Sequence, residues 1–356
     1  MRSLVKVNRN FHLLSAALLN LFMVLVLTSC SKKHELPPDF PKQATTYPAS
    51  FITQTAATLN GDIRTLQKVT TYSFQYGTTT SYTKSIPGSS LAGRFGNILP
   101  EDIIVHSTLT GLSPGTIYYY SLRTEGYGIS NGEDASFTTL IPGESGIIFN
   151  PDLIYGSVSD NDGNTYKTIQ IGTQTWIAEN LKTTKFNDGT YIQLVENNTQ
   201  WENLNAPAYC WYDNDISIYK IHTGALYNYY AVNSSKLCPV GWHVPAEAEW
   251  ETLITYLGGD SLDVVKLNET GATHWIICNP QSLPRNQNLS GFTALPGGYR
   301  DPVGWYDFIG VNGEWWSSTE DSATGRVKDL NIYVAGLMWT SSDKINGESV
   351  RCIKDN

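Results

Sequence analysis

Apolar and polar residues alternate along much of the chain between residues 47 and 140. Tyr72, Phe74 and Tyr76 fall on one face of an extended segment, and the same alternation returns from 118 to 122. Short runs of this kind, rich in Thr and aromatic residues, are separated by Gly, Pro and Asn. A sheet with one apolar face needs a second sheet to cover it. Residues 47–140 are therefore predicted to form an all-β sandwich.

One amphipathic helix is predicted further along the chain. Four apolar residues recur there at helical spacing and form one stripe. They are Trp250, Leu253, Ile254 and Leu257. Pro245 precedes the stripe and Gly258 follows it, which are start and stop signals. Glu247 and Glu249 fall in the first turn, where carboxylates complement the helix dipole and need no catalytic explanation.

The first thirty residues are predicted to be a targeting segment. The apolar run 13–27 follows three basic residues and is shorter than the ~20 apolar residues of a spanning helix. This favours a signal peptide over residues 1–29. The run ends in "LTSC", which resembles the bacterial lipobox, in which the cysteine, here Cys30, becomes the lipidated N-terminus. The alternatives are an ordinary signal peptide or an anchor helix with a coincidental cysteine.

Composition divides the remainder of the chain. Residues 30–46 hold the lipidation cysteine and three prolines, as expected of a solvated tether. Every one of the ten Trp residues lies at Trp176 or later. We place a linker at 141–153 and a second domain at 154–356, which is long enough for its own core.

The charge balance argues against a nucleic-acid partner. Cleavage before Cys30 would remove three of the 24 basic residues and leave 21 against 33 acidic ones, a net charge of −12. Such a chain repels phosphate backbones, and no cluster of Lys and Arg with interleaved aromatic residues offsets the repulsion.

Four cysteines remain in the mature chain. They are Cys210, Cys238, Cys278 and Cys352. An even number in an exported protein suggests two disulfides with three possible pairings. A zinc site is the rival, but zinc sites favour close Cys pairs and the smallest gap here is 28 residues.

The first domain resembles a fibronectin type III domain. The resemblance rests on "LTGLSPGTIYYYSLRTEG", in which Leu112, Pro114, Thr116 and Tyr118 stand as in that family's tyrosine-corner strand. It implies a spacer, since such domains are usually spacers or docking surfaces.

The second domain resembles the Fibrobacter succinogenes major paralogous domain. "GALYNYYAV", "KLCPVGWHVPAEAEWETLITYLGG", "GEWWSSTE" and "SVRCIKD" occur in that family's order. The family is similar to the formylglycine-generating-enzyme/C-type-lectin superfamily. The resemblance implies an irregular α+β, C-type-lectin-like fold with one main helix and an antiparallel sheet that joins early and late strands. It also favours Cys238–Cys352 or Cys210–Cys238 as one disulfide.

The superfamily's chemistry lacks its residues here. The generating enzymes bind copper with two neighbouring cysteines, whereas Cys352 has no cysteine nearer than Cys278, 74 residues upstream. The EPN, QPD and WND triplets of calcium-dependent lectins are absent, as are H-E-x-x-H and G-x-S-x-G. We therefore predict no catalytic residue, no metal and no cofactor. His243 is expected to be a hydrogen-bonded core residue, and Ala246 occupies the position where Ser or Thr usually caps the helix.

Aromatic residues near an arginine are the remaining functional hint. The ligand-binding candidates are Arg300, Trp305, Tyr306, Trp315 and Trp316. Rings beside an Arg and carboxylates suit stacking on sugars or peptide side chains. The alternative, favoured for Trp315 and Trp316, is that these residues pack the core.

Together these features predict a protein of the bacterial cell envelope, anchored through Cys30 to the outer membrane. Its second domain would be a non-catalytic module that binds a glycan or an envelope protein. The alternatives are a divergent enzyme of the generating-enzyme superfamily and a purely architectural surface protein.

Overall fold

The structure is a computed structural model that describes most of the chain from residue 44 onward. The described ranges are 44–64, 71–88, 102–125, 129–142, 144, 146–259, 266–271, 273–275, 287–321, 324–331 and 336–356. The predicted signal peptide, Cys30, most of the tether and Cys278 lie outside them. Within them, no helix has both the length and the apolar character needed to cross a bilayer.

The described residues fall into two compact units. The first contains the described residues up to 47 and those within 60–107 and 119–135. The second contains 48–59, 108–118 and the described residues from 136 to 356.

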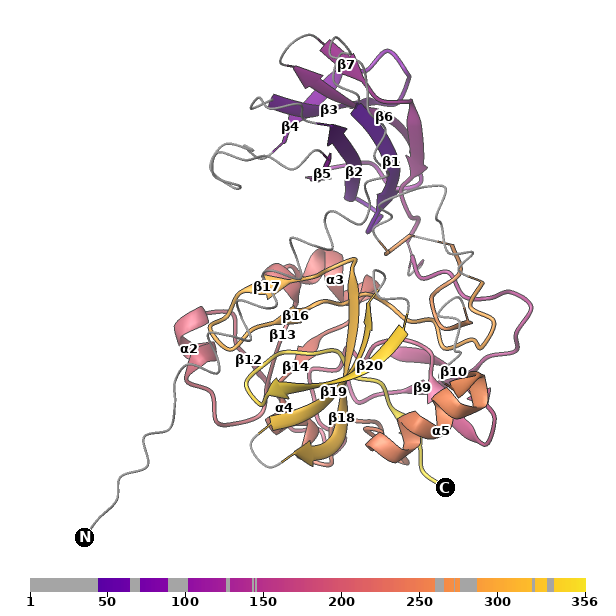
Figure 1. Ribbon diagram of the computed structural model, residues 1–356, viewed down its shortest axis with the longest axis vertical. Helices are drawn as coiled ribbons and strands as arrows, with labels where there is room; N and C mark the ends of the chain where they lie inside the picture. Colours follow the sequence, from indigo (N-terminus) through magenta and orange to yellow (C-terminus); the bar gives the residue numbers. More distant parts are fainter. Residues whose placement is uncertain are drawn as a thin grey trace. The chain divides into compact units, whose positions relative to one another are not determined.

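Two sheets are built from the strands before residue 140 (Figure 1). One has the order β1-β2-β5; the other has the order β4-β3-β6-β7, with β8 also paired to β6. The bounds are β1 Ala44–Ser50, β2 Ala57–Arg64, β3 Thr71–Gly77, β4 Lys84–Pro87, β5 Asp102–Leu109, β6 Ile117–Glu125, β7 Ile129–Asn131 and β8 Ala135–Thr138.

The two sheets pack face to face. The Tyr120 hydroxyl on β6 donates to the Tyr47 carbonyl on β1 at 2.5 Å. A Cβ at Gly61 on β2 would lie 2.7 Å from Leu122, so only glycine allows this close approach. The all-β sandwich is therefore confirmed. Its tyrosine corner is formed as well, because the Tyr118 hydroxyl accepts the Ser113 N–H at 3.0 Å.

The later part of the chain contains several small sheets and short helices. A five-stranded sheet has the order β15-β21-β11-β10-β9, and the others are β12-β13-β14, β16-β17 and β18-β19-β20. The strand bounds are β9 Gly156–Ser159, β10 Thr165–Ile171, β11 Gln174–Ile177, β12 Gln193–Leu194, β13 Ala208–Cys210, β14 Leu226–Tyr227, β15 Trp242–His243, β16 Tyr299–Arg300, β17 Tyr306–Asp307, β18 Asn312–Asp321, β19 Thr324–Asn331, β20 Gly336–Asp343 and β21 Ile353–Lys354. The helices are α2 Asn198–Glu202, η1 Tyr212–Asn214, α3 Ile216–His222, α4 Tyr229–Val232 and α5 Glu247–Leu257.

The five-stranded sheet joins early and late strands, as the family resemblance implies. Trp176 on β11 lies opposite Ile353 on β21, and His243 on β15 lies opposite the same residue from the other side. The C-terminal strand is therefore inserted between two earlier strands.

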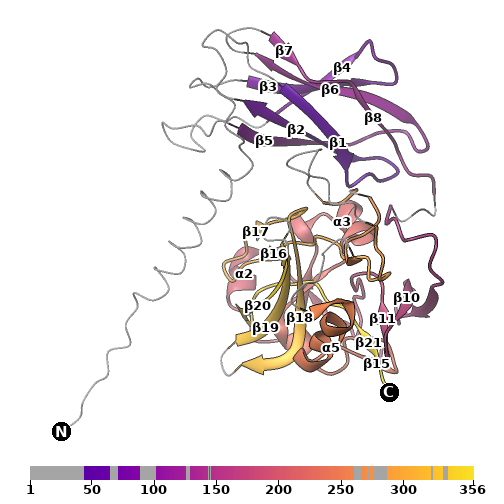
Figure 2. The same cartoon turned by 45° about the vertical axis from the view of Figure 1, so that its right-hand side comes forward.

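The predicted helix is α5, and its predicted apolar stripe is buried. Ala246 supplies no side-chain cap, but two other groups act at this helix terminus. The Glu249 carboxylate accepts the Ala246 N–H at 2.8 Å, and the Thr319 hydroxyl on β18 accepts the Glu247 N–H at 2.9 Å. Strand β18, which lies beside α5 (Figure 2), thus replaces the missing serine or threonine.

Tryptophans fill the core between α5 and the sheets. Trp176, Trp250 and Trp315 are fully buried, with ring centroids 4.9 Å apart for the first two and 6.1 Å apart for the last two. Phe292 packs against all three rings. Large rings can occupy a core that short, irregular elements leave open.

Candidate binding site

A short hairpin carries three of the predicted ligand-binding residues. Strands β16 and β17 pair antiparallel, with Arg300 opposite Tyr306. Trp305 stands at the end of the connecting loop, next to Tyr306. The hairpin therefore brings together Arg300, Trp305 and Tyr306, as the sequence suggests.

The loop of this hairpin is held by its own backbone contacts. Asp301 Oδ1 accepts the N–H groups of Val303 and Trp305 at 3.0 and 2.8 Å, and the Asp301 N–H donates to the Trp305 carbonyl. Gly304 has a φ of +96°, and a Cβ there would lie 2.6 Å from Asn198. Only glycine fits that conformation without strain. The loop is thus fixed without any help from a ligand.

The two aromatic residues play different parts. Trp305 is 67% exposed. Tyr306 is half-buried: its hydroxyl donates to Asn214 Oδ1 at 2.7 Å, and its ring packs 5.2 Å from that of Tyr212. Trp305 therefore presents its ring to solvent while Tyr306 fastens the hairpin to the neighbouring segment.

Arg300 is fully buried beneath the hairpin. Its Nε donates to the Gly304 carbonyl at 3.1 Å, and its Nη1 donates to the Val195 carbonyl at 2.6 Å. Its Nη2 donates to the Glu196 carbonyl at 2.8 Å and to Asn198 Oδ1 at 2.9 Å. Because all three guanidinium nitrogens donate hydrogen bonds to protein oxygens, Arg300 supports the hairpin and does not face a ligand.

Carboxylates on and beside the hairpin give this part of the surface a negative charge. Asp301 and Asp307 belong to the hairpin, and Asp213 and Asp215 flank Asn214. Partial burial, followed by the charge of Asp215, raises the pKa of Asp213. Partial burial, followed by the charge of Asp301, raises the pKa of Asp307. A negative face of this kind disfavours anionic ligands.

The other two aromatic candidates lie in the core. Trp315 and Trp316 are both fully buried. Trp315 Nε1 donates to Asn180 Oδ1 at 2.8 Å, and Trp316 Nε1 donates to the Tyr227 carbonyl at 2.6 Å. Burial with satisfied N–H groups removes both residues from the candidate ligand surface, which leaves Trp305 and Tyr306.

The cysteines form one of the expected cross-links. Cys238 and Cys352 are disulfide-bonded, with their Cα atoms 6.0 Å apart. Cys210 is a free, buried thiol, so the predicted second bridge does not form through it. Burial raises the pKa of Cys210 to about 11, against the lowering effect of Arg300. Such a thiol is protonated and unreactive at neutral pH.

His243 forms hydrogen bonds, as predicted, but it is not a core residue. Its Nδ1 lies 2.6 Å from Asp355 Oδ1, and its Nε2 lies 3.0 Å from Glu249 Oε1. The side chain remains partly exposed because β15 lies at the edge of the five-stranded sheet. Partial burial lowers its pKa, but the hydrogen bonds and charges of Asp355 and Glu249 outweigh burial, so the pKa of His243 is raised.

We expect Asp355→Asn to lower the pKa of His243, because the variant removes one of the two carboxylates that favour the imidazolium. In the parent protein the pair stabilises the fold at pH values below the unfolded-state pKa of 6.5, and this contribution disappears as the pH rises through the raised pKa. An NMR titration of the His243 ring measures the change. Asp188→Asn, which disrupts an exposed pair with Lys236, should leave that titration unchanged. An unchanged or higher pKa in Asp355→Asn would contradict the assignment.

Two histidines that are far apart in sequence meet in the interior. His222 Nδ1 lies 2.6 Å from His274 Nε2, and His274 Nδ1 lies 2.7 Å from Glu269 Oε2. All three side chains are fully buried. Sequence spacing gave no signal for this chain of contacts, which has no access to solvent. Among the described residues, no group of three or more His, Cys, Asp or Glu side chains is arranged to hold a metal ion.

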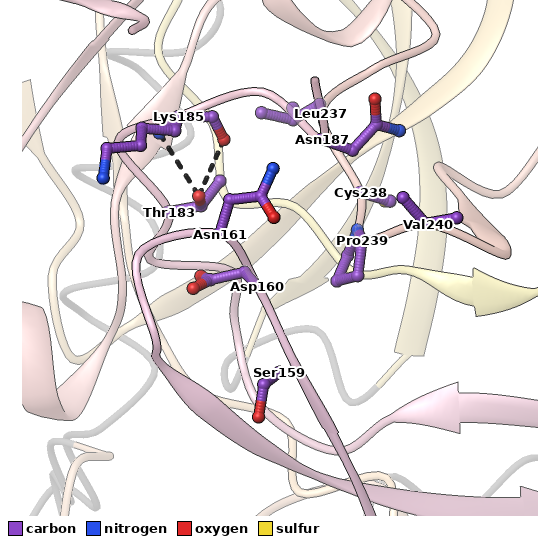
Figure 3. A pocket seen from close by; sticks show the side chains of 10 residues that line it. All are labelled: Ser159, Asp160, Asn161, Thr183, Lys185, Asn187, Leu237, Cys238, Pro239 and Val240. Carbon is purple, nitrogen blue, oxygen red and sulfur yellow. Dashed lines mark hydrogen bonds between the residues drawn. The ribbon is translucent and has the colours of Figure 1, made fainter. Parts of the chain in front are cut away.

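A small pocket lies between three segments of the second unit (Figure 3). Residues from 159–161, 183–187 and 237–240 line a volume of about 140 Å³. Its wall includes Cys238 of the disulfide, so the cross-link helps to fix its shape. No sequence motif indicated this pocket, because its wall is assembled from three separated segments.

Comparison with known proteins places the larger part of the chain in a family context. Residues 169–354 match the family model described as Fibrobacter succinogenes major domain. No curated protein matches the chain.

Several solved structures resemble a smaller part of the chain. The sensor domain of the anti-sigma factor RsgI4 in Pseudobacteroides cellulosolvens is 24% identical, covers 29% of this chain and 97% of that chain, and has a TM-score of 0.23. A fibronectin type III domain derived from human KIAA0970 protein is 19% identical, covers 33% of this chain and 85% of that chain, and has a TM-score of 0.22. The fibronectin type III domain of human fibronectin type III domain containing protein 3 is 16% identical, covers 32% of this chain and 99% of that chain, and has a TM-score of 0.21. Likeness at these scores carries no functional inference.

Proposed function

Since this chain belongs to the Fibrobacter succinogenes major domain family, we propose that it is a non-catalytic binding module of the cell envelope whose ligand is a glycan. The family and the disulfide indicate a surface or envelope protein. The lipid anchor at Cys30 and the outer-membrane location are part of the proposal, and so is a C-type-lectin-like ancestry of the second domain. The tether and the fibronectin-type sandwich would hold the module away from the bilayer.

The observation that carries the proposal is the exposed ring of Trp305 on a rigid support. An indole that is two-thirds in water gains little for folding, yet Asp301 and Gly304 fix the backbone that carries it. A flat ring on a fixed backbone can stack on the apolar face of a sugar without the entropy cost of ordering the loop.

The surroundings of Trp305 favour a neutral glycan over other ligands. Asp213, Asp301 and Asp307 can accept hydrogen bonds from sugar hydroxyls, and their charges disfavour sulfated or uronic-acid chains. The Arg300 guanidinium donates its hydrogen bonds to protein oxygens and is fully buried, so it does not offset these charges at the surface. A protein ligand would contact the same exposed ring, and the experiment below distinguishes a glycan ligand from a protein ligand.

We also propose that the protein has no catalytic activity. Cys210 is a buried thiol that interacts with Arg300 and Tyr306 of the hairpin, and its raised pKa of about 11 disfavours nucleophilic chemistry at neutral pH. A binding surface is thus the simplest role for the hairpin.

We expect Trp305→Ala to weaken binding of a neutral glycan at least tenfold, because a central aromatic residue carries a large share of the binding energy at a small site. The full chain is first tested against panels of neutral and anionic glycans and of envelope proteins. The affinity of the best ligand is then measured by calorimetry for the parent and the variant.

Tyr256→Ala is the matched control, because Tyr256 on α5 is exposed to the same degree, at 65%. It should bind as the parent does. An unchanged affinity in Trp305→Ala would refute the site. A preference for anionic glycans would refute the proposed ligand class. Binding to envelope proteins alone would indicate that the ligand is a protein and not a glycan. No ligand in any panel would favour an architectural role.

A further inference from the structure

Two side-chain amides with hydrogen-bonding groups to spare line the pocket between residues 159–161, 183–187 and 237–240 (Figure 3). Asn161 Nδ2 donates to the Phe186 carbonyl at 3.1 Å, which leaves its Oδ1 as an acceptor without a partner in the described chain. The side chain of Asn187 makes no hydrogen bond to any described residue, although its backbone N–H donates to the Lys236 carbonyl. Figure 3 shows the Asn161 amide directed toward Cys238 and Pro239, and the Asn187 side chain beside Leu237 and Cys238 with its amide directed away from Asn161.

The charged groups of the pocket are neutralised by protein partners. Asp160 Oδ1 accepts two backbone N–H groups, and its Oδ2 accepts the Tyr166 hydroxyl at 2.6 Å. Lys185 Nζ lies 3.2 Å from Asp162 Oδ1. A charged ligand would therefore have to break an existing pair, whereas an uncharged polar ligand meets the two amides directly.

The opposite wall of the pocket is apolar. Leu237, Cys238 and Pro239 are buried side by side along one segment, and Val240 continues it at the surface. The volume of about 140 Å³ exceeds that of a single water, about 30 Å³ in the liquid, and falls short of the about 300–1,000 Å³ of pockets for drug-sized ligands. The space suits one substituent of a larger molecule.

We infer that this pocket binds an acetamido group. Its carbonyl would accept from the amide nitrogen of Asn187, its N–H would donate to the free oxygen of Asn161, and its methyl group would rest on Leu237 and Pro239. An acetamido group is uncharged, has one donor and one acceptor, and ends in a methyl group, so it matches each wall of the pocket. It occurs on N-acetylated amino sugars and on N-acetylated peptides, and the sugar is the source we favour. This site is separate from the Trp305 hairpin and does not depend on the glycan proposed there.

The test is a ligand-observed NMR titration of the full chain with four small probes. N-acetylglucosamine carries the acetamido group on a sugar, glucosamine and glucose lack it, and N-acetylglycinamide carries it without a sugar. We expect N-acetylglucosamine to bind in the millimolar range and glucose and glucosamine to bind at least fivefold more weakly. Asn187→Ala should weaken N-acetylglucosamine about fivefold, as for the loss of one hydrogen bond.

Asn233→Ala is the control, because Asn233 is an exposed asparagine at the end of α4 and lies outside the pocket. It should bind like the parent. Asn187 makes no side-chain hydrogen bond to a described residue, so its variant is expected to fold. Binding of N-acetylglycinamide with the same dependence on Asn187 would support the acetamido site and assign it to peptides. Equal binding of glucose and N-acetylglucosamine, an affinity unaffected by Asn187→Ala, or no binding of either acetamido probe would each overturn the inference.

Discussion

Removal of the Cys238–Cys352 disulfide is expected to lower the free energy of unfolding of the second unit by about 4–5 kcal/mol. The two cysteines are separated by 114 positions, and closing a loop of that size removes a large amount of conformational entropy from the unfolded chain. The bond also ties the segment before β15 to the start of β21, the strand that lies between β15 and β11 in the sheet. The double variant Cys238→Ala/Cys352→Ala therefore loses the covalent link between β21 and the segment that leads into β15, one of its two neighbours.

The measurement is urea unfolding followed by tryptophan fluorescence. All ten tryptophans lie at Trp176 or later, so the signal reports on the part of the chain that follows the sandwich. Cys210→Ala is the control, because it removes a buried thiol that makes no cross-link. It should cost about 1 kcal/mol. A double variant no less stable than this control, or a parent protein whose stability is unaffected by reduction, would show that the disulfide contributes little.

The features that the sequence alone predicts depend either on residues close together in the chain or on motifs that occur in the order of a known family. The helix α5 was predicted because its stripe, its start and its stop all lie within fifteen residues, and Gly258 ends it as expected. The alternation from Tyr72 to Tyr76 predicted a strand for the same reason. The pairing of Cys238 with Cys352 was one of two implied by the family resemblance.

The features that sequence missed depend on contacts between distant segments. The sequence suggests Arg300 as a ligand residue because an arginine near aromatic rings suits recognition, but its acceptors lie at Val195 and Glu196, more than a hundred residues away. The same holds for the contact of His222 with His274 and for the cap that Thr319 supplies to α5. No pattern within one segment can specify an acceptor on another, because the hydrogen bond exists only after both have been placed by the fold.

For a related reason, the sequence does not decide whether the side chain of Trp305 is exposed or buried. Glycines before it suggested a loop, but Trp315 and Trp316, a few residues later, are also near a glycine and are fully buried. The two cases differ in strand context: Trp315 and Trp316 lie within β18, which packs beside α5, whereas Trp305 ends a loop outside both strands of its hairpin. Burial is therefore decided by the neighbours of the strand and not by the residues flanking the ring.

Replacement of Arg300 by alanine is expected to lower the free energy of unfolding by about 3–5 kcal/mol and to abolish binding at the hairpin. The variant leaves the carbonyls of Val195, Glu196 and Gly304 without their donor, and each buried acceptor that loses its partner costs about 1 kcal/mol or more. It also removes the guanidinium that stacks 4.3 Å from the ring of Trp201.

Arg300→Lys separates shape from charge. A lysine keeps the positive charge, but its single ammonium cannot span acceptors on both sides of a planar fork. We therefore expect Arg300→Lys to recover less than half of the lost stability in urea unfolding, whereas Trp305→Ala, which removes an exposed ring, should unfold within about 0.5 kcal/mol of the parent. If Arg300→Lys restored full stability and full binding, charge alone would explain the residue. If Arg300→Ala were as stable as the parent, the buried guanidinium would not be what holds the hairpin, and the rigidity of Trp305 would need another cause.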